Sequence, residues 1–118
     1  MNSGILFEPQ EIVLTTIRFP DQLVAKKRPV LVISKFSKNT SEEIFICVPI
    51  TSSLSDEQFA IKMNVSDMQE GSLYKPSQVL CQYYFTELKN MVYKKIGKVT
   101  PQFYHKVKTK INTEILDV

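Results

Sequence analysis

Short runs of β-branched and apolar residues, each bounded by turn residues, constrain the fold of this chain more than any other feature. The run over Gln58–Val65 is the clearest, because polar or small residues alternate there with Phe59, Ile61, Met63 and Val65. A period of two puts the apolar side chains on one face of an extended strand. The segment is therefore predicted to be a half-buried β-strand.

Similar runs predict strands elsewhere along the chain. They cover Glu11–Arg18, Val30–Lys35, Glu43–Ile50, Gln78–Phe85 and Met91–Ile96. Segments rich in polar and turn-forming residues separate them, including a loop at Phe19–Lys27 and a turn at 37–41. About five to seven short strands are expected in total.

The pattern changes after Thr100, which is a suitable helix N-cap, and Pro101 suits the first helical position. Apolar residues then recur every fourth position, at Phe103, Val107, Ile111 and Ile115. This stripe predicts a closing helix with one buried face, and the lysines between its members face outward. Strands followed by one helix predict a mainly β fold, a small bent antiparallel sheet or barrel, in a single domain over residues 1–118.

Composition places the chain among ordinary globular proteins. Its 118 residues are 43% hydrophobic and 23% charged, enough to bury a core in one domain. The net charge of +3 does not by itself indicate a nucleic-acid partner. Basic residues do cluster at 26–28, at 94–98 and at 106–110, and such clusters are either solubilising lysines or a local positive surface.

Nothing in the sequence suggests export or membrane insertion. The first residues lack a basic segment followed by an apolar core, and no apolar run approaches the ~20 residues of a membrane span. Cys47 and Cys81 both lie in apolar, strand-like surroundings with no Cys-x-x-Cys spacing. We therefore expect a cytoplasmic protein with two buried, reduced thiols and no metal site.

The candidate site lies where two predicted strands meet loops. Charged residues run into an apolar strand at Arg28 and Pro29, and the following strand ends in hydroxyls at Thr51, Ser52 and Ser53. A guanidinium fork and nearby hydroxyls suit the binding of a phosphate group. Two plainer interpretations stay open: Arg28 forms a surface salt bridge with Asp21 or Glu11, and the hydroxyls only close a turn.

Several segments occur in an order typical of one family. They are Glu11–Leu14, Phe19–Asp21, Arg28–Ser34, Val48–Ser52, Leu73–Val79 and Lys95–Val99. Together they span nearly the whole chain, which resembles the MazF/PemK-like toxins of type II toxin–antitoxin systems. The resemblance implies an SH3-like β-barrel, a homodimer, and sequence-selective cleavage of single-stranded RNA without a metal ion or other cofactor. It also implies a cognate antitoxin that blocks the site and binds DNA together with the toxin.

The same resemblance implies that Arg28 and Thr51 carry catalysis. In metal-free RNA cleavage the ribose 2′-hydroxyl attacks phosphorus, so the enzyme must stabilise negative charge and help protons move. Arg28 suits the first task, while its high pKa makes it a poor general acid. The one histidine, His105, falls on the exposed part of the predicted helix, so the base stays unassigned.

Contacts to RNA are predicted around these two residues. The expected set is Lys27, Ser52, Ser53, Lys75, Ser77 and Phe19. Unpaired bases commonly stack on aromatic side chains, and the candidates are Phe19, Phe36, Tyr74, Tyr83 and Tyr84, although aromatic residues in strands are more often core.

Two departures from the family pattern leave other functions open. The first strand opens with Gln10-Glu11 where the family has Gly-Asp, and the first loop carries Gln22–Ala25 in place of small polar residues. The second change affects RNA preference or antitoxin fit. A catalytically silent barrel that binds RNA or a protein is one alternative. A gyrase poison of the same fold is another alternative. The resembling gyrase poisons rely on a C-terminal tail that contains Trp, and this chain contains no Trp, which disfavours this function.

Overall fold

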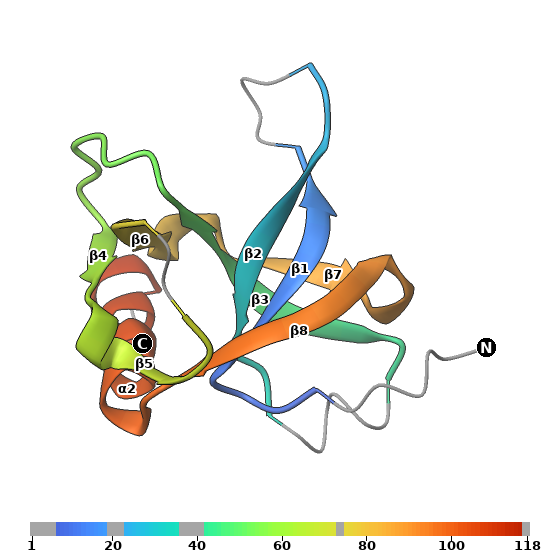
Figure 1. Ribbon diagram of the computed structural model, residues 1–118. Helices are drawn as coiled ribbons and strands as arrows, with labels where there is room; N and C mark the ends of the chain where they lie inside the picture. The colour runs from blue at the N-terminus through green and yellow to red at the C-terminus, as the bar shows by residue number, and fades with distance from the viewer. Residues whose placement is uncertain (1–6, 19–22, 36–41, 73–74, 117–118) are drawn as a thin grey trace.

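A computed structural model of the protein describes residues 7–18, 23–35, 42–72 and 75–116. Within these ranges, eight strands form one curled antiparallel sheet in the order β4-β6-β3-β2-β1-β8-β5, with β7 paired to β3 (Figure 1). The strands are β1 Glu11–Ile17, β2 Lys26–Val32, β3 Ile44–Thr51, β4 Ala60–Met63, β5 Met68–Glu70, β6 Ser77–Leu80, β7 Phe85–Leu88 and β8 Val92–Val99. Short 3₁₀ turns link some of them, at η1 Val65–Asp67, η2 Cys81–Tyr83 and η3 Lys89–Met91.

The closing helix forms as predicted. Helix α2 covers Pro101–Lys110, and the hydroxyl of Thr100 caps it by accepting a hydrogen bond of 3.1 Å from the amide of Phe103. The apolar stripe continues beyond α2 through a π-helical turn, η4, at Ile111–Ile115. In the part of the chain that the structure describes, no helix has the length and apolar character to cross a membrane.

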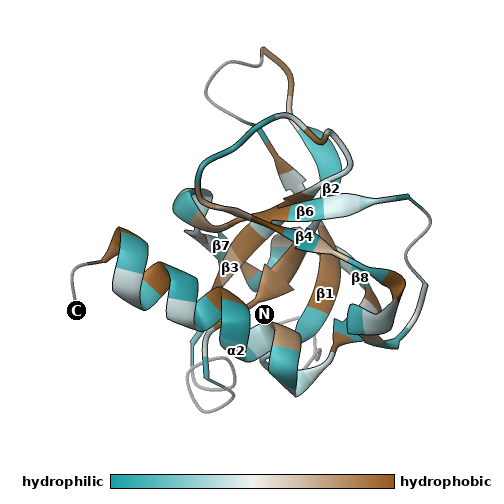
Figure 2. Ribbon diagram, turned by 90° about the vertical axis from the view of Figure 1, so that its left-hand side faces the viewer, coloured by the Kyte–Doolittle hydropathy of each residue, from teal (hydrophilic) through white to brown (hydrophobic). Residues whose placement is uncertain are grey.

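Alternation along β1 and β2 gives the sheet two apolar faces. Helix α2 covers one of them, where Ile12, Leu31 and Val48 pack against Phe103 and Val107. Figure 2 shows the helix lying across these apolar strands. We call the interior of the second face the barrel core; it consists of Phe7, Val13, Val30, Val32, Phe45 and Cys47. The curl of the sheet thus encloses a second, smaller core on the side away from α2.

Strand β2 begins four residues earlier than predicted, at Lys26 rather than Val30. The three basic residues before Pro29 belong to the strand because they pair with β1, in register with Ile17, Thr16 and Thr15. This end of the hairpin projects from the body of the molecule (Figure 1). Charged residues in a projecting hairpin face solvent, which is why their composition indicated a loop.

The predicted strand Gln78–Phe85 is wrong as a single element. Strand β6 ends at Leu80, the turn η2 follows, and β7 begins at Phe85. The two strands pair with different ends of β3, β6 opposite Ile50 and β7 opposite Cys47, so the chain must bend between them. Together with β5, this division raises the number of described strands to eight, above the expected range.

The remaining strand predictions are confirmed, with differences at their ends. The predicted Glu11–Arg18, Glu43–Ile50 and Met91–Ile96 correspond to β1, β3 and β8. The alternating segment Gln58–Val65 corresponds to the shorter β4.

Both cysteines are free and buried, as predicted. Burial raises the pKa of the Cys47 thiol well above its ordinary value, and the nearby charge of Glu87 adds to the shift. Burial also raises the pKa of Cys81, to about 11. Thiols held neutral in this way are inert, so they serve as small core residues.

Candidate functional site

The two predicted catalytic residues lie on neighbouring strands of the sheet. Arg28 is on β2, half-buried, and its Nε atom is buried. Strands β2 and β3 pair from Val32 opposite Cys47 to Val30 opposite Pro49, and Arg28 and Thr51 each lie two residues beyond the last pair. Side chains two residues apart on a strand share a face of the sheet. The alternation therefore assigns Arg28 and Thr51 to one face, that of the barrel core.

Neighbouring residues restrict the backbone at Arg28 and the hydroxyl of Thr51. Pro29 fixes its own φ and favours an extended backbone at Arg28. The hydroxyl oxygen of Thr51 accepts a hydrogen bond of 3.1 Å from the amide of Ser53, which closes the turn after β3. Because the Thr51 oxygen acts as an acceptor there, its proton is available for donation to a phosphate oxygen. The turn-closing role and the phosphate-binding role are therefore compatible.

Glu11, one of the two alternative salt-bridge partners of Arg28, has other partners in the structure. The carboxylate of Glu11 lies 3.0 Å from Lys95 Nζ and accepts a hydrogen bond of 2.7 Å from the amide of Glu8. Glu11 is also at the opposite end of β1 from Thr15, the residue that pairs with Arg28. The other proposed partner, Asp21, lies outside the described residues.

Thr15 and Glu87 were not predicted as site residues. Thr15 is fully buried beside Arg28, and its hydroxyl lies 2.8 Å from Glu87 Oε2 and 3.1 Å from the carbonyl oxygen of Met91. The other carboxylate oxygen of Glu87 accepts a hydrogen bond of 2.9 Å from the amide of Leu88. One signal for this network was in the sequence: Thr15 follows Val13 on the inward face of β1, and a buried hydroxyl needs a partner.

The other predicted RNA contacts fall into two groups. Ser52 and Ser53 directly follow Thr51 in the chain, and both are exposed. Lys75 and Ser77 instead line a cavity of about 610 Å³ on the opposite face of β2. Pro29, which follows Arg28, also lines this cavity, so the two surfaces share one strand.

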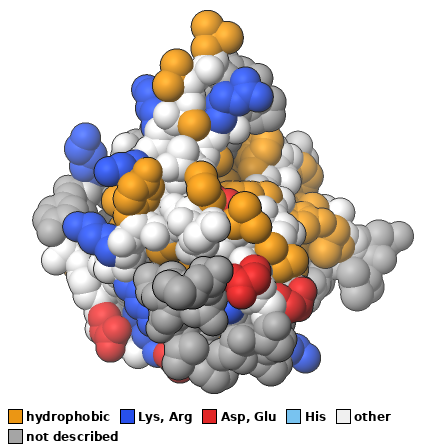
Figure 3. All heavy atoms as spheres, turned by 90° about the vertical axis from the view of Figure 1, so that its right-hand side faces the viewer, with side chains coloured by type: hydrophobic (Ala, Val, Ile, Leu, Met, Phe, Trp, Pro, Cys, Tyr) orange, Lys and Arg blue, Asp and Glu red, His pale blue; other side chains and the backbone are white. Residues whose placement is uncertain are grey.

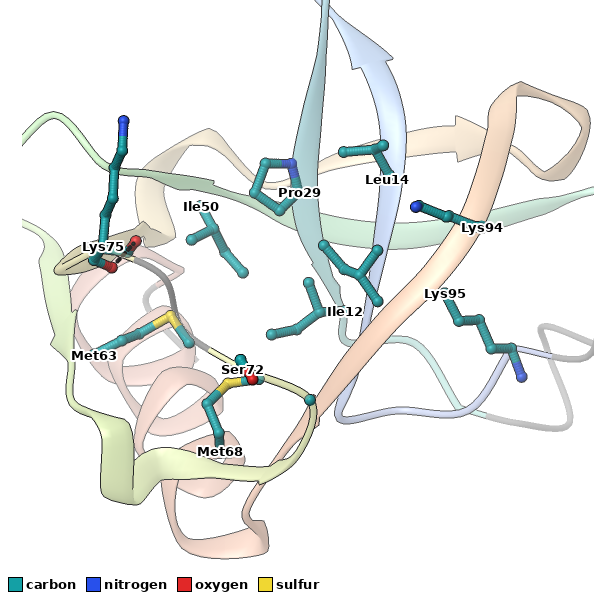
Figure 4. A pocket seen from close by; sticks show the side chains of 13 residues that line it. Ile12, Leu14, Pro29, Ile50, Met63, Met68, Ser72, Lys75, Lys94 and Lys95 are labelled. Atoms are coloured by element: carbon teal, nitrogen blue, oxygen red, sulfur yellow. Dashed lines mark hydrogen bonds between the residues drawn. The ribbon is translucent and has the colours of Figure 1, made fainter.

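The cavity has an apolar floor and a basic rim. Ile12, Leu14 and Pro29 point into it from one side and Met63 and Met68 from the other (Figure 4). Its basic lining residues are Lys75, Lys94 and Lys95, and its described lining includes no acidic residue. The amine of Lys95 is paired with Glu11 and points away from the cavity (Figure 4).

Lys27 lies on the outer side of the β1–β2 hairpin. Its Nζ sits 4.1 Å from the centre of the Tyr93 ring, and the Tyr93 hydroxyl is 3.1 Å from that of Thr16. Among the stacking candidates, Tyr83 and Tyr84 are 38% and 37% exposed. Phe19, Phe36 and Tyr74 lie outside the described residues. His105 is exposed on α2, as expected.

Taken together, the chain is a curled antiparallel half-barrel closed by one helix, with Arg28 and Thr51 on neighbouring strands. The sequence profile of the PemK-like, MazF-like toxins of type II toxin–antitoxin systems matches residues 8–115. The chain therefore belongs to this toxin family, which confirms the predicted resemblance.

Solved structures share the fold. An endoribonuclease from a mycobacterial species aligns with a TM-score of 0.73 and 17% identity, over 92% of this chain and 90% of that one. A mycobacterial endoribonuclease in complex with its cognate antitoxin aligns with a TM-score of 0.71 and 19% identity, over 90% of this chain and 91% of that one. A MazE–MazF complex from Deinococcus radiodurans aligns with a TM-score of 0.74 and 14% identity, over 92% of this chain and 95% of that one. These likenesses confirm the predicted barrel fold. Among curated proteins, no sequence matches significantly.

Proposed function

We propose that the protein is the toxin of a type II toxin–antitoxin pair and cleaves single-stranded RNA at selected sequences without a metal ion. The positions of Arg28 and Thr51 on neighbouring strands, on the same face by alternation, carry this proposal. Family membership and the endoribonucleases among the structural neighbours support it. The chain acts as one domain over residues 1–118, in the cytoplasm, where its substrate is found.

The chemistry is a transesterification at phosphorus. The ribose 2′-oxygen forms a bond to phosphorus as its proton leaves, and the bond to the 5′-oxygen breaks as that oxygen takes up a proton. The products are a 2′,3′-cyclic phosphate and a 5′-hydroxyl. Arg28 can hold two non-bridging oxygens with its planar fork while negative charge builds on them. Thr51 donates its hydroxyl proton to one of these oxygens, which adds to the same stabilisation.

The RNA chain beyond the scissile phosphate contacts polar groups on both faces of β2. Ser52 and Ser53 bind the phosphate next to Thr51, and Lys27 and Phe19 bind from the β1–β2 hairpin. Lys75 and Ser77 hold a neighbouring nucleotide at the cavity, where the basic rim matches the charge of the backbone.

A homodimer and an antitoxin complete the assembly. The β7–η3–β8 connection exposes Leu88, Met91 and Tyr93, which are 48%, 40% and 52% accessible. Figure 3 shows this side of the molecule, where apolar side chains gather. Contiguous apolar surface of this kind typically marks a contact between proteins, here a second copy of the chain. We propose that an acidic segment of the antitoxin competes with RNA for the basic residues.

Cleavage of a long single-stranded RNA in EDTA tests the activity. Wild type is expected to cut at a few sequences, and Arg28→Ala to cut none of them. Arg18→Ala is the matched control, because Arg18 is an exposed arginine just after β1 and is not one of the proposed RNA contacts. Salt-dependent RNA binding without cleavage, on RNAs of varied sequence, would instead indicate the catalytically silent barrel.

A further inference from the structure

Glu87 brings a carboxylate to the face of the sheet that carries Arg28. Strand β7 pairs with β3, with Glu87 opposite Phe45, a residue of the barrel core. Opposed residues share a face, so the Glu87 side chain points toward the barrel core.

The hydrogen bonds of Glu87 link it to the neighbour of Arg28. Its Oε2 lies 2.8 Å from the hydroxyl of Thr15, which pairs directly with Arg28. Directly opposed residues have Cβ atoms about 4.5–5.5 Å apart. The Glu87 carboxylate is thus within the span of an arginine side chain that starts at the Arg28 backbone.

The two hydrogen bonds hold this carboxylate still. The amide of Leu88 donates to Oε1 and the hydroxyl of Thr15 lies against Oε2, so both oxygens have fixed partners. The Thr15 hydroxyl also reaches the carbonyl oxygen of Met91, which ties the η3 turn to β1. A fixed negative charge beside a flexible cation restricts where that cation can lie, and it does so more strongly in a partly buried setting.

We infer that Glu87 is a positioning residue of the cleavage site. The Glu87 carboxylate acts through Arg28, because its fixed charge favours the guanidinium orientation that receives the phosphate. The inference rests on the proposed function for its catalytic consequence. Thr15 is the intermediate that fixes the carboxylate. Glu87 does not touch the reacting atoms, so its loss lowers the rate by misplacing Arg28.

The competing role for Glu87 is purely structural, a tie between β1 and the β7–η3–β8 connection. A double-mutant cycle in single-turnover RNA cleavage separates the two. Glu87→Gln is expected to lower the rate constant about 10- to 100-fold with little change in KM, because small misplacements at a reacting centre have costs of this size. In an Arg28→Lys background, the same change is expected to lower the remaining rate less than about 2-fold.

Two further variants sharpen this cycle. Glu87→Asp, which keeps the charge, is expected to recover part of the rate. Glu11→Gln is the matched control, because Glu11 is a buried carboxylate on the same sheet that also accepts from a backbone amide. Two results would overturn the inference. In the first, Glu87→Gln lowers the cleavage rate by the same factor in the Arg28→Lys background as in wild type. In the second, Glu11→Gln lowers the rate as much as Glu87→Gln does.

A second readout does not depend on cleavage. The Nε atom of Arg28 is buried, so its N–H signal in ¹⁵N NMR spectra should exchange slowly with water. Glu87→Gln is expected to shift this signal and speed its exchange, and Glu11→Gln to leave it unchanged. If Glu87→Gln shifts the Arg28 signal but the wild-type protein does not cleave RNA, the proposed function is refuted and the positioning role stands. An unchanged Arg28 signal in Glu87→Gln would overturn the positioning role even if the wild type cleaves RNA.

Discussion

Thr15 on β1 and Arg28 on β2 are direct cross-strand partners, so a fully buried hydroxyl lies on the sheet face of the proposed site. The hydroxyl in turn contacts Glu87, which is 72 residues further along the chain. The backbone of Arg28 thus pairs with a residue whose side chain joins β1 to β7. This arrangement differs from the isolated surface arginine that the sequence also allowed, and it makes the rigidity of the site measurable.

Removing the Thr15 hydroxyl should destabilise the protein. Thr15→Val keeps the shape of the side chain but leaves Glu87 and the Met91 carbonyl without their donor. We expect the free energy of unfolding in urea to fall by about 1 to 2 kcal/mol. Thr16→Val is the control, because the Thr16 hydroxyl is more exposed and lies 3.1 Å from the Tyr93 hydroxyl at the surface. Equal effects of the two changes would show that the buried network contributes nothing special.

Gly71 should tolerate substitution less well than Gly97. Gly71 has φ of +82°, and a Cβ there would lie 2.5 Å from the carbonyl oxygen of Ile96. Gly71→Ala therefore combines a left-handed backbone with a clash, and we expect it to lower the free energy of unfolding by about 2 to 4 kcal/mol. At Gly97 a Cβ would meet the movable end of Met68 and the Glu70 carbonyl, both at 2.9 Å. In thermal unfolding, the Tm of Gly71→Ala should be lower than the Tm of Gly97→Ala, and the reverse order would contradict the geometry.

Lys75 should contribute to RNA binding through its charge. Lys75→Ala removes one cation from the rim of the cavity, so RNA affinity should fall for all sequences alike. The slope of log K against log salt should decrease by about 0.7, the value for one phosphate contact in a single strand. Lys62→Ala is the control, because Lys62 is exposed on β4 and does not line the cavity. An unchanged slope in Lys75→Ala would remove this lysine from the proposed RNA path.

Alkaline pH should weaken the fold through Cys81. Burial raises the pKa of this thiol from 9.0 to about 11 in the folded protein, so the folded state keeps a proton that the unfolded state loses. The stabilisation is complete below pH 9 and is lost as pH rises from there to about 11. Denaturant titrations across this range should show a shallower decline for Cys81→Ala than for wild type. Parallel declines would mean that Cys81 does not contribute to the pH dependence.

Much of the fold could be predicted because its signals are local. Helix α2 follows from the four-residue spacing of Phe103 and Val107 and from the Thr100 cap, all readable within a few residues. The division of Gln78–Phe85 could not be predicted, because apolar residues continue through the bend at Cys81. Only the pairing of β6 and β7 with opposite ends of β3 requires that bend, and such pairing depends on contacts distant in sequence.

The site was predictable only in part for the same reason. Arg28 and Thr51 were proposed from their positions in an ordered family pattern, and the fold puts them on neighbouring strands. Glu87 carries no local signal, since a glutamate near the end of a strand is ordinary. Its role depends on the closure of the barrel, which brings β7 against β1 through the hydroxyl of Thr15.

The most direct test compares single-turnover RNA cleavage in EDTA by wild type, Arg28→Ala, Thr51→Ala and the control Arg18→Ala. We predict that Arg28→Ala lowers the rate constant by about 100-fold or more, because it removes a preorganised donor to the developing charge. Thr51→Ala should lower it less, Arg18→Ala should match wild type, and the product ends should be a 2′,3′-cyclic phosphate and a 5′-hydroxyl. Cleavage by Arg28→Ala at the wild-type rate would contradict the assignment of this site.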